Sequence, residues 1–182
     1  HLFPKLEQLT LNAGTIQLGA NTSLPALETL SIQTHALTRR ALADVLSMKA
    51  PKLKRLSLWF GRASRGSTAT LDGLAAILDG TRFPKLVHLG LMNCEWVGDA
   101  VRALPTSKVL RQLESLDLSM GCLTDDDVAA MQEHRAAFAR LEQLNLHDNG
   151  LSKKAATAGL AKHVHLGKQD PKRATRYASV GE

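Results

Sequence analysis

Leucines recur along the chain with a spacing that predicts short β-strands. Residues 141–151 read Leu-Glu-Gln-Leu-Asn-Leu-His-Asp-Asn-Gly-Leu, with leucines at positions 1, 4, 6 and 11 of the segment. Polar residues at positions 3, 5 and 7 alternate with the leucines, as in a strand with one buried face. Asn149, at position 9, can bond to the backbone of a turn. The segment therefore predicts a strand, a tight turn and a return to the core.

The first half of this pattern occurs six times along the chain. Its first leucines are separated by 21, 26, 33, 27 and 28 residues. An apolar residue lies three positions before each first leucine and forms a second period. One such unit cannot bury its own leucines, so successive units must stack on one another. The first leucines are Leu6, Leu27, Leu53, Leu86, Leu113 and Leu141.

The segments between the strands differ in their predicted structure. Residues 12–23 are rich in Gly, Thr and Asn and predict a loop, and residues 61–68 are an irregular insertion. Thr38 is placed to cap the first helix, and three aspartates at 125–127 suit the first turn of another. Apolar spacing predicts helices over residues 39–49, 71–78, 98–104, 125–139 and 152–162.

The C-terminal segment departs from the repeated pattern. Residues 163–166 predict a degenerate seventh strand with Val164 and Leu166 pointing inward. Residues 176–180 alternate and would lay Tyr177 over the end of the core. We therefore expect a solenoid of about six repeats over 1–163 and a C-terminal cap and basic tail over 164–182. The first residues enter the pattern without a cap, so we expect the chain to be part of a longer protein.

Composition narrows the setting in which the protein acts. The chain has 182 residues, 44% of them hydrophobic and 22% charged, which is typical of one globular domain. No apolar run approaches the ~20 residues that span a bilayer, and we expect no membrane association. Cys94 and Cys122 are too few for a disulfide framework. Both lie at or beside position 9, as buried turn residues would, and we expect a cytoplasmic location.

The basic charge is concentrated at the C-terminal end. The net charge is +6, and residues 152–182 contribute +5 of it, with seven basic and two acidic residues. A basic tail can bind nucleic acid or an acidic protein surface. Few aromatic residues are interleaved with the basic ones, so we do not expect nucleic acid to be the partner.

These motifs resemble those of leucine-rich repeat proteins of the ribonuclease-inhibitor-like class. The resemblance covers about residues 3–163 and implies a right-handed α/β horseshoe. Such a solenoid has a parallel sheet on its concave face and helices on its convex face. Members of this family generally bind proteins, and the resemblance implies no catalytic residue and no cofactor. The motifs that carry it are 141–151, 113–118 with Cys122-Leu-Thr-Asp125, and 86–94.

Outward strand residues would form columns across the concave sheet, and the middle columns are the most distinctive. Trp59 near Met92 and Arg55 resembles the centre of a protein interface, where Trp and Arg are enriched. An alternative stays open, in which Trp59 and Phe60 pack under the insertion. Trp96, at position 11, is expected in the core. The predicted partner-binding residues are Arg55, Trp59, Phe60, His88, Met92, Asp117 and His147.

The sequence contains a histidine cluster but no catalytic motif. His147 and His165 would approach each other if the seventh strand forms, but a metal site needs three or four ligands. No Gly-rich phosphate loop or nucleophile elbow occurs in the chain. We therefore expect a non-enzymatic scaffold that binds a protein partner through its concave sheet. The alternative is the recognition domain of a larger enzyme or effector whose catalytic part lies outside this chain.

Overall fold

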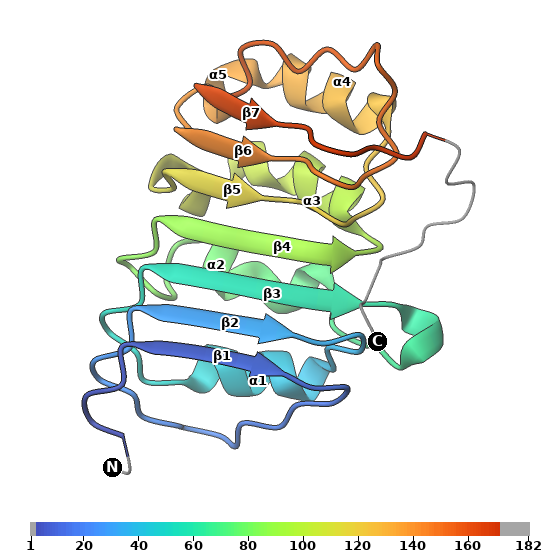
Figure 1. The fold of residues 1–182 in the computed structure, drawn as a ribbon. Coiled ribbons are helices and arrows are strands. Elements are labelled where there is room, and N and C mark those ends of the chain that lie inside the picture. The colour runs from blue at the N-terminus through green and yellow to red at the C-terminus, as the bar shows by residue number, and fades with distance from the viewer. Residues whose placement is uncertain (1–2, 172–182) are drawn as a thin grey trace.

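Seven parallel strands form one open sheet, and they lie in the sheet in their order along the chain (Figure 1). The structure is a computed structural model and describes residues 3–171. The strands are β1 Gln8–Asn12, β2 Thr29–Gln33, β3 Arg55–Gly61, β4 His88–Cys94, β5 Ser115–Asp117, β6 Gln143–Asn145 and β7 His163–His165. The helices are α1 Arg39–Ser47, α2 Ala75–Leu78, α3 Val97–Ala103, α4 Asp125–Glu133 and α5 Arg135–Phe138.

The strand register aligns the leucines of successive units into rows. Leu56 of β3 pairs with Leu30 on one side and Leu89 on the other, and Leu116 and Leu144 continue the row. All five side chains are at most 1% exposed. The predicted alignment of the six segments is therefore confirmed, and the shared row buries what no single unit could bury alone.

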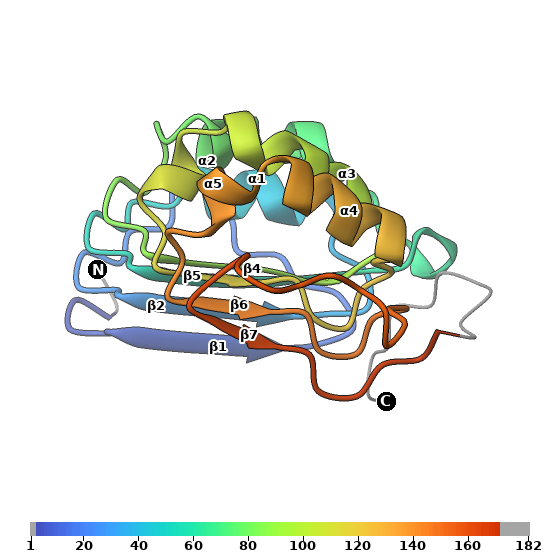
Figure 2. The same cartoon turned by 90° about the horizontal axis from the view of Figure 1, so that it is seen from above.

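All the helices between residues 3 and 171 lie on one face of the sheet and leave the other face open (Figure 2). In the same view the two edges of the sheet lie further from the helices than its middle does, so the open face is concave. The longest helices, α1 and α4, have nine residues each. No helix between residues 3 and 171 has the length and apolar character needed to cross a membrane. The architecture is α/β with a single open parallel sheet, which is compatible with a solenoid or horseshoe.

Asn149 ties together the turn that follows β6, as its position in the sequence predicts. Its Nδ2 donates to the carbonyl oxygens of Leu118 and Leu146, at 3.0 Å each, and to that of His147 at 3.3 Å. Its Oδ1 accepts the Leu123 N–H at 3.0 Å. The side chain is fully buried, and it satisfies backbone groups of two successive units that lack a strand partner.

The helix predicted over 152–162 does not form, and that prediction is wrong. The segment is built of turns, and Gly159 has a φ of +76°, which a right-handed helix excludes. Side chains of α4 and α5 donate hydrogen bonds to its carbonyl groups. Gln132 donates to the carbonyls of Ala156 and Ala158, and the Arg135 Nε donates to that of Gly159 at 3.2 Å. These tertiary bonds replace the bonds that a helix would have made.

The other helices lie where the pattern places them, with bounds that differ by a few residues. Residues 71–78 form a 3₁₀ turn over Leu71–Leu74 that runs into α2, and the helix predicted over 125–139 breaks at His134 between α4 and α5. Short 3₁₀ turns also cover Ala63–Arg65, Leu104–Thr106 and Val109–Arg111. Thr38 caps α1 by accepting the Ala41 N–H.

The first turn of α4 uses its aspartates in structural bonds. Asp127 Oδ2 accepts the Thr124 N–H at 2.8 Å and so completes a capping box. Asp127 Oδ1 also pairs with Arg102 at 2.8 Å. Asp125 accepts the Ser152 N–H at 2.8 Å, which joins this helix to the next unit. Two of the three acidic side chains therefore support the helix N-terminus and its neighbours.

The predicted seventh strand is present as β7 and pairs with β6 in register. Val164 is half-buried and continues the inward row. Leu166 is 36% exposed, so the prediction that it points inward is wrong. It follows the end of β7, where the alternation of the strand no longer sets its direction. The predicted cap residue Tyr177 lies outside the described residues.

Gly61 ends β3 and provides a test of how closely successive units approach. Its φ is +74°, and a Cβ atom at this position would lie 1.8 Å from the His35 carbonyl oxygen. Gly61→Ala should therefore cost at least ~3 kcal/mol of unfolding free energy, through both backbone strain and a clash with backbone. Gly19 also has a φ of +74° but has open space around it. Gly19→Ala should cost only about 1 kcal/mol, and equal urea unfolding midpoints for the two variants would contradict this packing.

Candidate functional site

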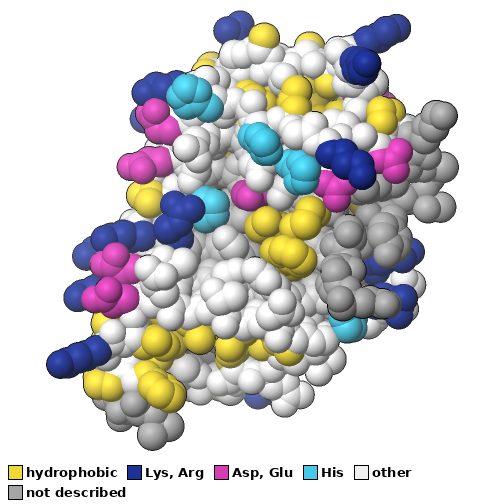
Figure 3. Space-filling view, in the orientation of Figure 1, with side chains coloured by type: hydrophobic (Ala, Val, Ile, Leu, Met, Phe, Trp, Pro, Cys, Tyr) yellow, Lys and Arg dark blue, Asp and Glu magenta, His cyan; other side chains and the backbone are white. Residues whose placement is uncertain are grey.

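The concave face opposite the helices is the candidate functional site. Figure 3 views this face and shows histidines and a central hydrophobic group across it, with many charged side chains along the edge where the strands begin. The outward residues follow the predicted columns. The third-position column contains Thr29, Arg55, His88, Ser115 and Gln143, and each is the register partner of the next.

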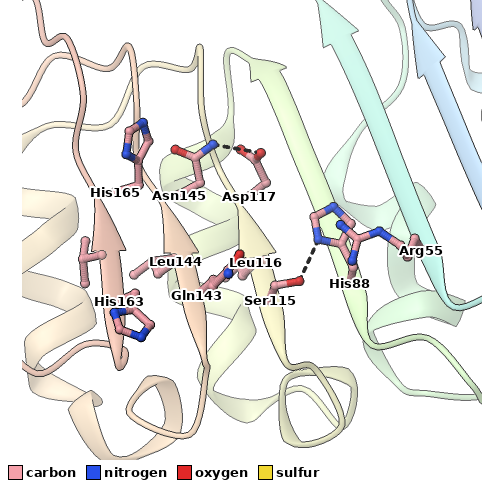
Figure 4. A pocket seen from close by; sticks show the side chains of 11 residues that line it. Arg55, His88, Ser115, Leu116, Asp117, Gln143, Leu144, Asn145, His163 and His165 are labelled. Carbon is pink, nitrogen blue, oxygen red and sulfur yellow. Dashed lines mark hydrogen bonds between the residues drawn. The ribbon is translucent and has the colours of Figure 1, made fainter.

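A pocket of about 530 Å³ opens on this face over strands β3 to β7 (Figure 4). Its polar lining comes from alternate residues of each strand, because those side chains point away from the core. The predicted binding residues Arg55, His88 and Asp117 all line this pocket. The remaining lining residues are Ser115, Leu116, Gln143, Leu144, Asn145, His163, Val164 and His165.

His88 is held between two serines on the neighbouring strands. Its Nε2 lies 3.2 Å from the Ser57 Oγ of β3, and its Nδ1 lies 2.8 Å from the Ser115 Oγ of β5. A neutral imidazole has one nitrogen that donates and one that accepts, and both serine hydroxyls can do either. The three side chains therefore form a bonded bridge across β3, β4 and β5, which fixes the orientation of the ring.

The environment of His88 favours its neutral form. Burial is the main cause that lowers the pKa of His88 from its ordinary value of 6.5 to about 4. The neighbouring charge of Arg55 lowers this pKa further, and the carboxylate of Asp117 opposes the shift. Near neutral pH the pocket therefore presents an uncharged imidazole whose two nitrogens are bonded to the two serines.

Asp117 is oriented by its neighbours in the same way. Its Oδ2 accepts a hydrogen bond from the Asn145 Nδ2 at 2.9 Å, and its Oδ1 accepts the Ser119 N–H at 2.9 Å. The Asn145 Oδ1 in turn accepts the His147 N–H at 3.0 Å. The acidic side of the pocket is thus a fixed hydrogen-bonded group across β5 and β6.

Arg55 differs from the other charged residues on this face. Its side chain is exposed, and within residues 3–171 it has no carboxylate within 4.0 Å and no side-chain hydrogen bond. By contrast, its neighbour Lys54 pairs with Glu28 at 3.0 Å. Arg55 lies beside His88, and it is the only Lys or Arg among the described residues that line the pocket (Figure 4).

Trp59 and Met92 form an apolar pair next to the pocket. They are register partners on β3 and β4, and both are half-buried on the open face. The structure therefore places Trp59 on the face that was predicted for binding. Trp59 points to the same face as Arg55, which lies four residues earlier on β3.

Phe60 was predicted to bind a partner, and that prediction is wrong. Its side chain is fully buried, because residue 60 shares the inward parity of Leu56 and Leu58. The ring makes an edge contact with Trp96, with 4.6 Å between ring centroids. Trp96 was expected in the core, and it packs against the core but is only half-buried. Its Nε1 donates to the Ala69 carbonyl at 3.2 Å.

His147 and His165 come together, as expected if the seventh strand forms. Their ring centroids are 5.7 Å apart and the rings are stacked. The His147 Nδ1 accepts the Lys168 N–H at 3.2 Å, so this ring helps to hold the segment after β7. His165 lines the pocket and His147 lies just beyond it.

The predicted binding residues did not include Ser115, Gln143, Asn145 or His163. All four line the pocket because they occupy the same columns as the selected residues. The column positions alone could have found them. Their chemical type does not identify them, because small polar side chains are common on a solvated strand.

The fold is similar to that of a protein of known structure. No known protein family and no curated protein matches the sequence. A structural genomics crystal structure of a Bacteroides fragilis protein is similar, with a TM-score of 0.73 and 25% sequence identity. The match covers 84% of this chain and 45% of that protein, so this chain spans less than half of its length. The likeness supports the parallel-sheet fold and assigns no activity.

The lowered pKa of His88 predicts a loss of stability as the pH falls. Between its ordinary value of 6.5 and about 4, the unfolded chain binds a proton that the folded chain excludes. The contribution of neutral His88 to the free energy of unfolding is therefore complete above about pH 6.5. It is lost as the pH falls toward 4. Urea unfolding at about pH 7 and pH 5 should show a larger loss for the wild type than for His88→Gln. Equal losses, or an NMR titration midpoint of His88 near 6.5, would contradict the buried neutral ring.

Proposed function

We propose that the chain is a leucine-rich repeat protein of the ribonuclease-inhibitor-like class that binds a protein partner through its concave sheet. Three features support this class: six registered leucine segments, rows of buried leucines across a parallel sheet, and helices on one face only. The Bacteroides fragilis structure supports the fold.

The observation that carries the proposal is the half-buried Trp59–Met92 pair beside the exposed Arg55. Large apolar side chains on a strand normally face the core, and here both lie on the face that the helices leave open. Aromatic, Met and Arg side chains are enriched at the centres of protein interfaces. The polar pocket next to the pair supplies hydrogen-bonding groups for the rim of such an interface.

The bonded polar groups of this face suit the binding of a partner. His88 has both ring nitrogens bonded to serines and a pKa of about 4. Asp117 accepts hydrogen bonds at both of its oxygens. Groups that are engaged in this way hold their positions and offer a fixed surface, which reduces the ordering cost of association.

A second candidate function follows from the comparison of lengths. The similar Bacteroides fragilis protein contains more chain than the region matched here, since the match covers 45% of it. We propose as the alternative that this chain is the recognition part of a larger enzyme or effector. Both candidates use the same concave face, and they differ in whether further chain performs a reaction.

Replacement of the apolar pair should abolish partner capture. Truncation of Trp59 to Ala should cost about 2 kcal/mol of binding free energy if it anchors the interface. The double variant Trp59→Ala/Met92→Ala should lose in pull-downs the proteins that the wild-type chain retains.

A matched control uses exposed residues of the helical face. Arg39→Ala/Glu133→Ala changes side chains on α1 and α4 and should retain the same proteins as the wild type. Circular dichroism and urea unfolding of all variants would separate a binding loss from a folding loss. Equal capture by the Trp59/Met92 variant and the wild type would contradict a role for this face.

A further inference from the structure

Asp117 lies in the pocket of the concave face as a charged group without an oppositely charged partner. Its side chain is half-buried, and no Lys or Arg nitrogen within residues 3–171 lies within 4.0 Å of its oxygens. By contrast, the buried carboxylate of Asp127 pairs with Arg102 at 2.8 Å. Partial burial of a carboxylate without a cation is unfavourable, so a cationic group that reached Asp117 would be stabilised there.

The carboxylate of Asp117 can accept further hydrogen bonds. Each of its oxygens accepts one bond, from the Asn145 Nδ2 and from the Ser119 N–H, at 2.9 Å each. A carboxylate offers about four acceptor positions, so about two remain open. Both present donors are uncharged, so they fix the orientation of the carboxylate without neutralising it. Because Asp117 lines the pocket, a ligand in the pocket can reach the open positions.

The groups beside Asp117 are neutral hydrogen-bond acceptors. The amide oxygens of Gln143 and Asn145 and the hydroxyl of Ser115 belong to the same pocket (Figure 4). A guanidinium has five N–H donors in a planar fork, two of which can meet one carboxylate while the others reach neutral oxygens. His88 adds no positive charge near neutral pH, because its pKa is about 4. The surroundings of Asp117 therefore suit an arginine side chain.

Arg55 brings the opposite charge to the pocket. It is exposed, has no carboxylate within 4.0 Å among residues 3–171, and is the only Lys or Arg of that range in the pocket lining. Arg55 lies on β3 and Asp117 on β5, two residues further along the register, which places their Cα atoms about 12 Å apart. A guanidinium pairs with a carboxylate through two parallel hydrogen bonds. A ligand that satisfied both residues would therefore have a cation and a carboxylate.

We propose that this pocket binds a segment of a partner protein through two ion pairs, one between a basic side chain and Asp117 and one between an Asp or Glu side chain and Arg55. Arginine is the basic residue that fits Asp117 best. This proposal rests on the proposed function and specifies the charged groups of the partner that the concave face recognises.

The chemistry of the pocket favours a protein segment over other ligands. Pockets for small molecules are lined mainly by hydrophobic and aromatic side chains, whereas most side chains that line this pocket are polar. A phosphate chain would meet a single guanidinium and would be repelled by Asp117. A protein supplies both charges on nearby residues, and the adjacent Trp59–Met92 pair offers an apolar contact to the same partner.

A displayed library of random twelve-residue peptides, selected on the intact chain, supplies probes for this proposal. The selected peptides should contain a basic and an acidic residue within about five residues of each other, a spacing that an extended chain can match to the pocket. Labelled synthetic copies would be measured by fluorescence anisotropy. Exchange of the basic residue for a neutral isostere, citrulline for Arg or norleucine for Lys, should weaken binding at least about tenfold.

Asp117→Asn tests the pair with the basic residue, because it removes the charge and keeps the size of the side chain. The variant should bind the charged peptide at least about tenfold more weakly than the wild type does, and it should bind the neutral peptide nearly as well. A purely structural role of Asp117 would instead weaken both peptides by the same factor. If urea unfolding shows that this variant is not folded, the neutral peptide on the wild type still tests the cation.

Arg55→Glu tests the pair with the acidic residue. Its exposed side chain should allow the change without loss of the fold. The variant should bind the charged peptide at least about tenfold more weakly, and exchange of the peptide's acid for Lys should restore binding. Matched controls are Glu133→Gln and Arg39→Glu, which change the same charges at exposed positions of the helical face. Both controls should bind the peptides as the wild type does.

The outcomes separate this proposal from the proposed function. Selection of no peptides, equal binding of charged and neutral peptides by the wild type, or full binding of the charged peptide by either Asp117→Asn or Arg55→Glu would overturn the ion-pair proposal. If only Trp59→Ala/Met92→Ala loses the peptides, the concave face still binds partners and this proposal alone fails. If that double variant also retains the wild-type proteins in pull-downs, the proposed function fails as well.

Discussion

The structure depends on the stacking of inward leucines between neighbouring strands. Leu56, Leu89 and Leu116 are register partners in turn, and each is buried by the leucines on either side of it. Burial of such a side chain contributes roughly 2 kcal/mol, but only where a neighbouring unit covers it. The row therefore sets both the order of the strands and their register. Because strand residues alternate, the same register also fixes the columns of the open face.

The open face derives its character from this fixed register. Ser57, His88 and Ser115 meet across three strands because the rows beneath them are aligned, and their hydrogen bonds fix the orientation of the imidazole. Burial lowers the pKa of His88 to about 4 and so favours the neutral ring. Asp117 and Asn145 are joined by the same register one column further along the strands. A surface whose polar groups are already bonded to each other changes little when a partner arrives. In the proposed complex, specificity depends most on Arg55, Trp59 and Met92.

The columns and rows could be predicted from the sequence because they depend on local alternation and on one repeated spacing. The positions of Arg55, His88 and Asp117 on one face followed from the spacing alone. Phe60 faces inward because residue 60 has the same parity as Leu58, so the alternation that places Leu58 in the core also applies to Phe60.

Other features depend on contacts between distant segments. The turns at 152–162 replace a helix because Gln132 and Arg135, more than twenty residues earlier, bond to the carbonyls of that segment. The low pKa of His88 depends on burial between β3 and β5, and no local pattern contains that information.

Hydrogen exchange of the backbone amides, measured by NMR, tests most directly whether stacked leucine rows hold the sheet. If they do, the amides of β3 and β4, with covered leucines on both sides, should exchange slowest. Those of β1, whose leucines Leu9 and Leu11 are only half-buried, should exchange fastest among the longer strands. Exchange from β4 as fast as that from β1, or uniform exchange across the sheet, would contradict the account.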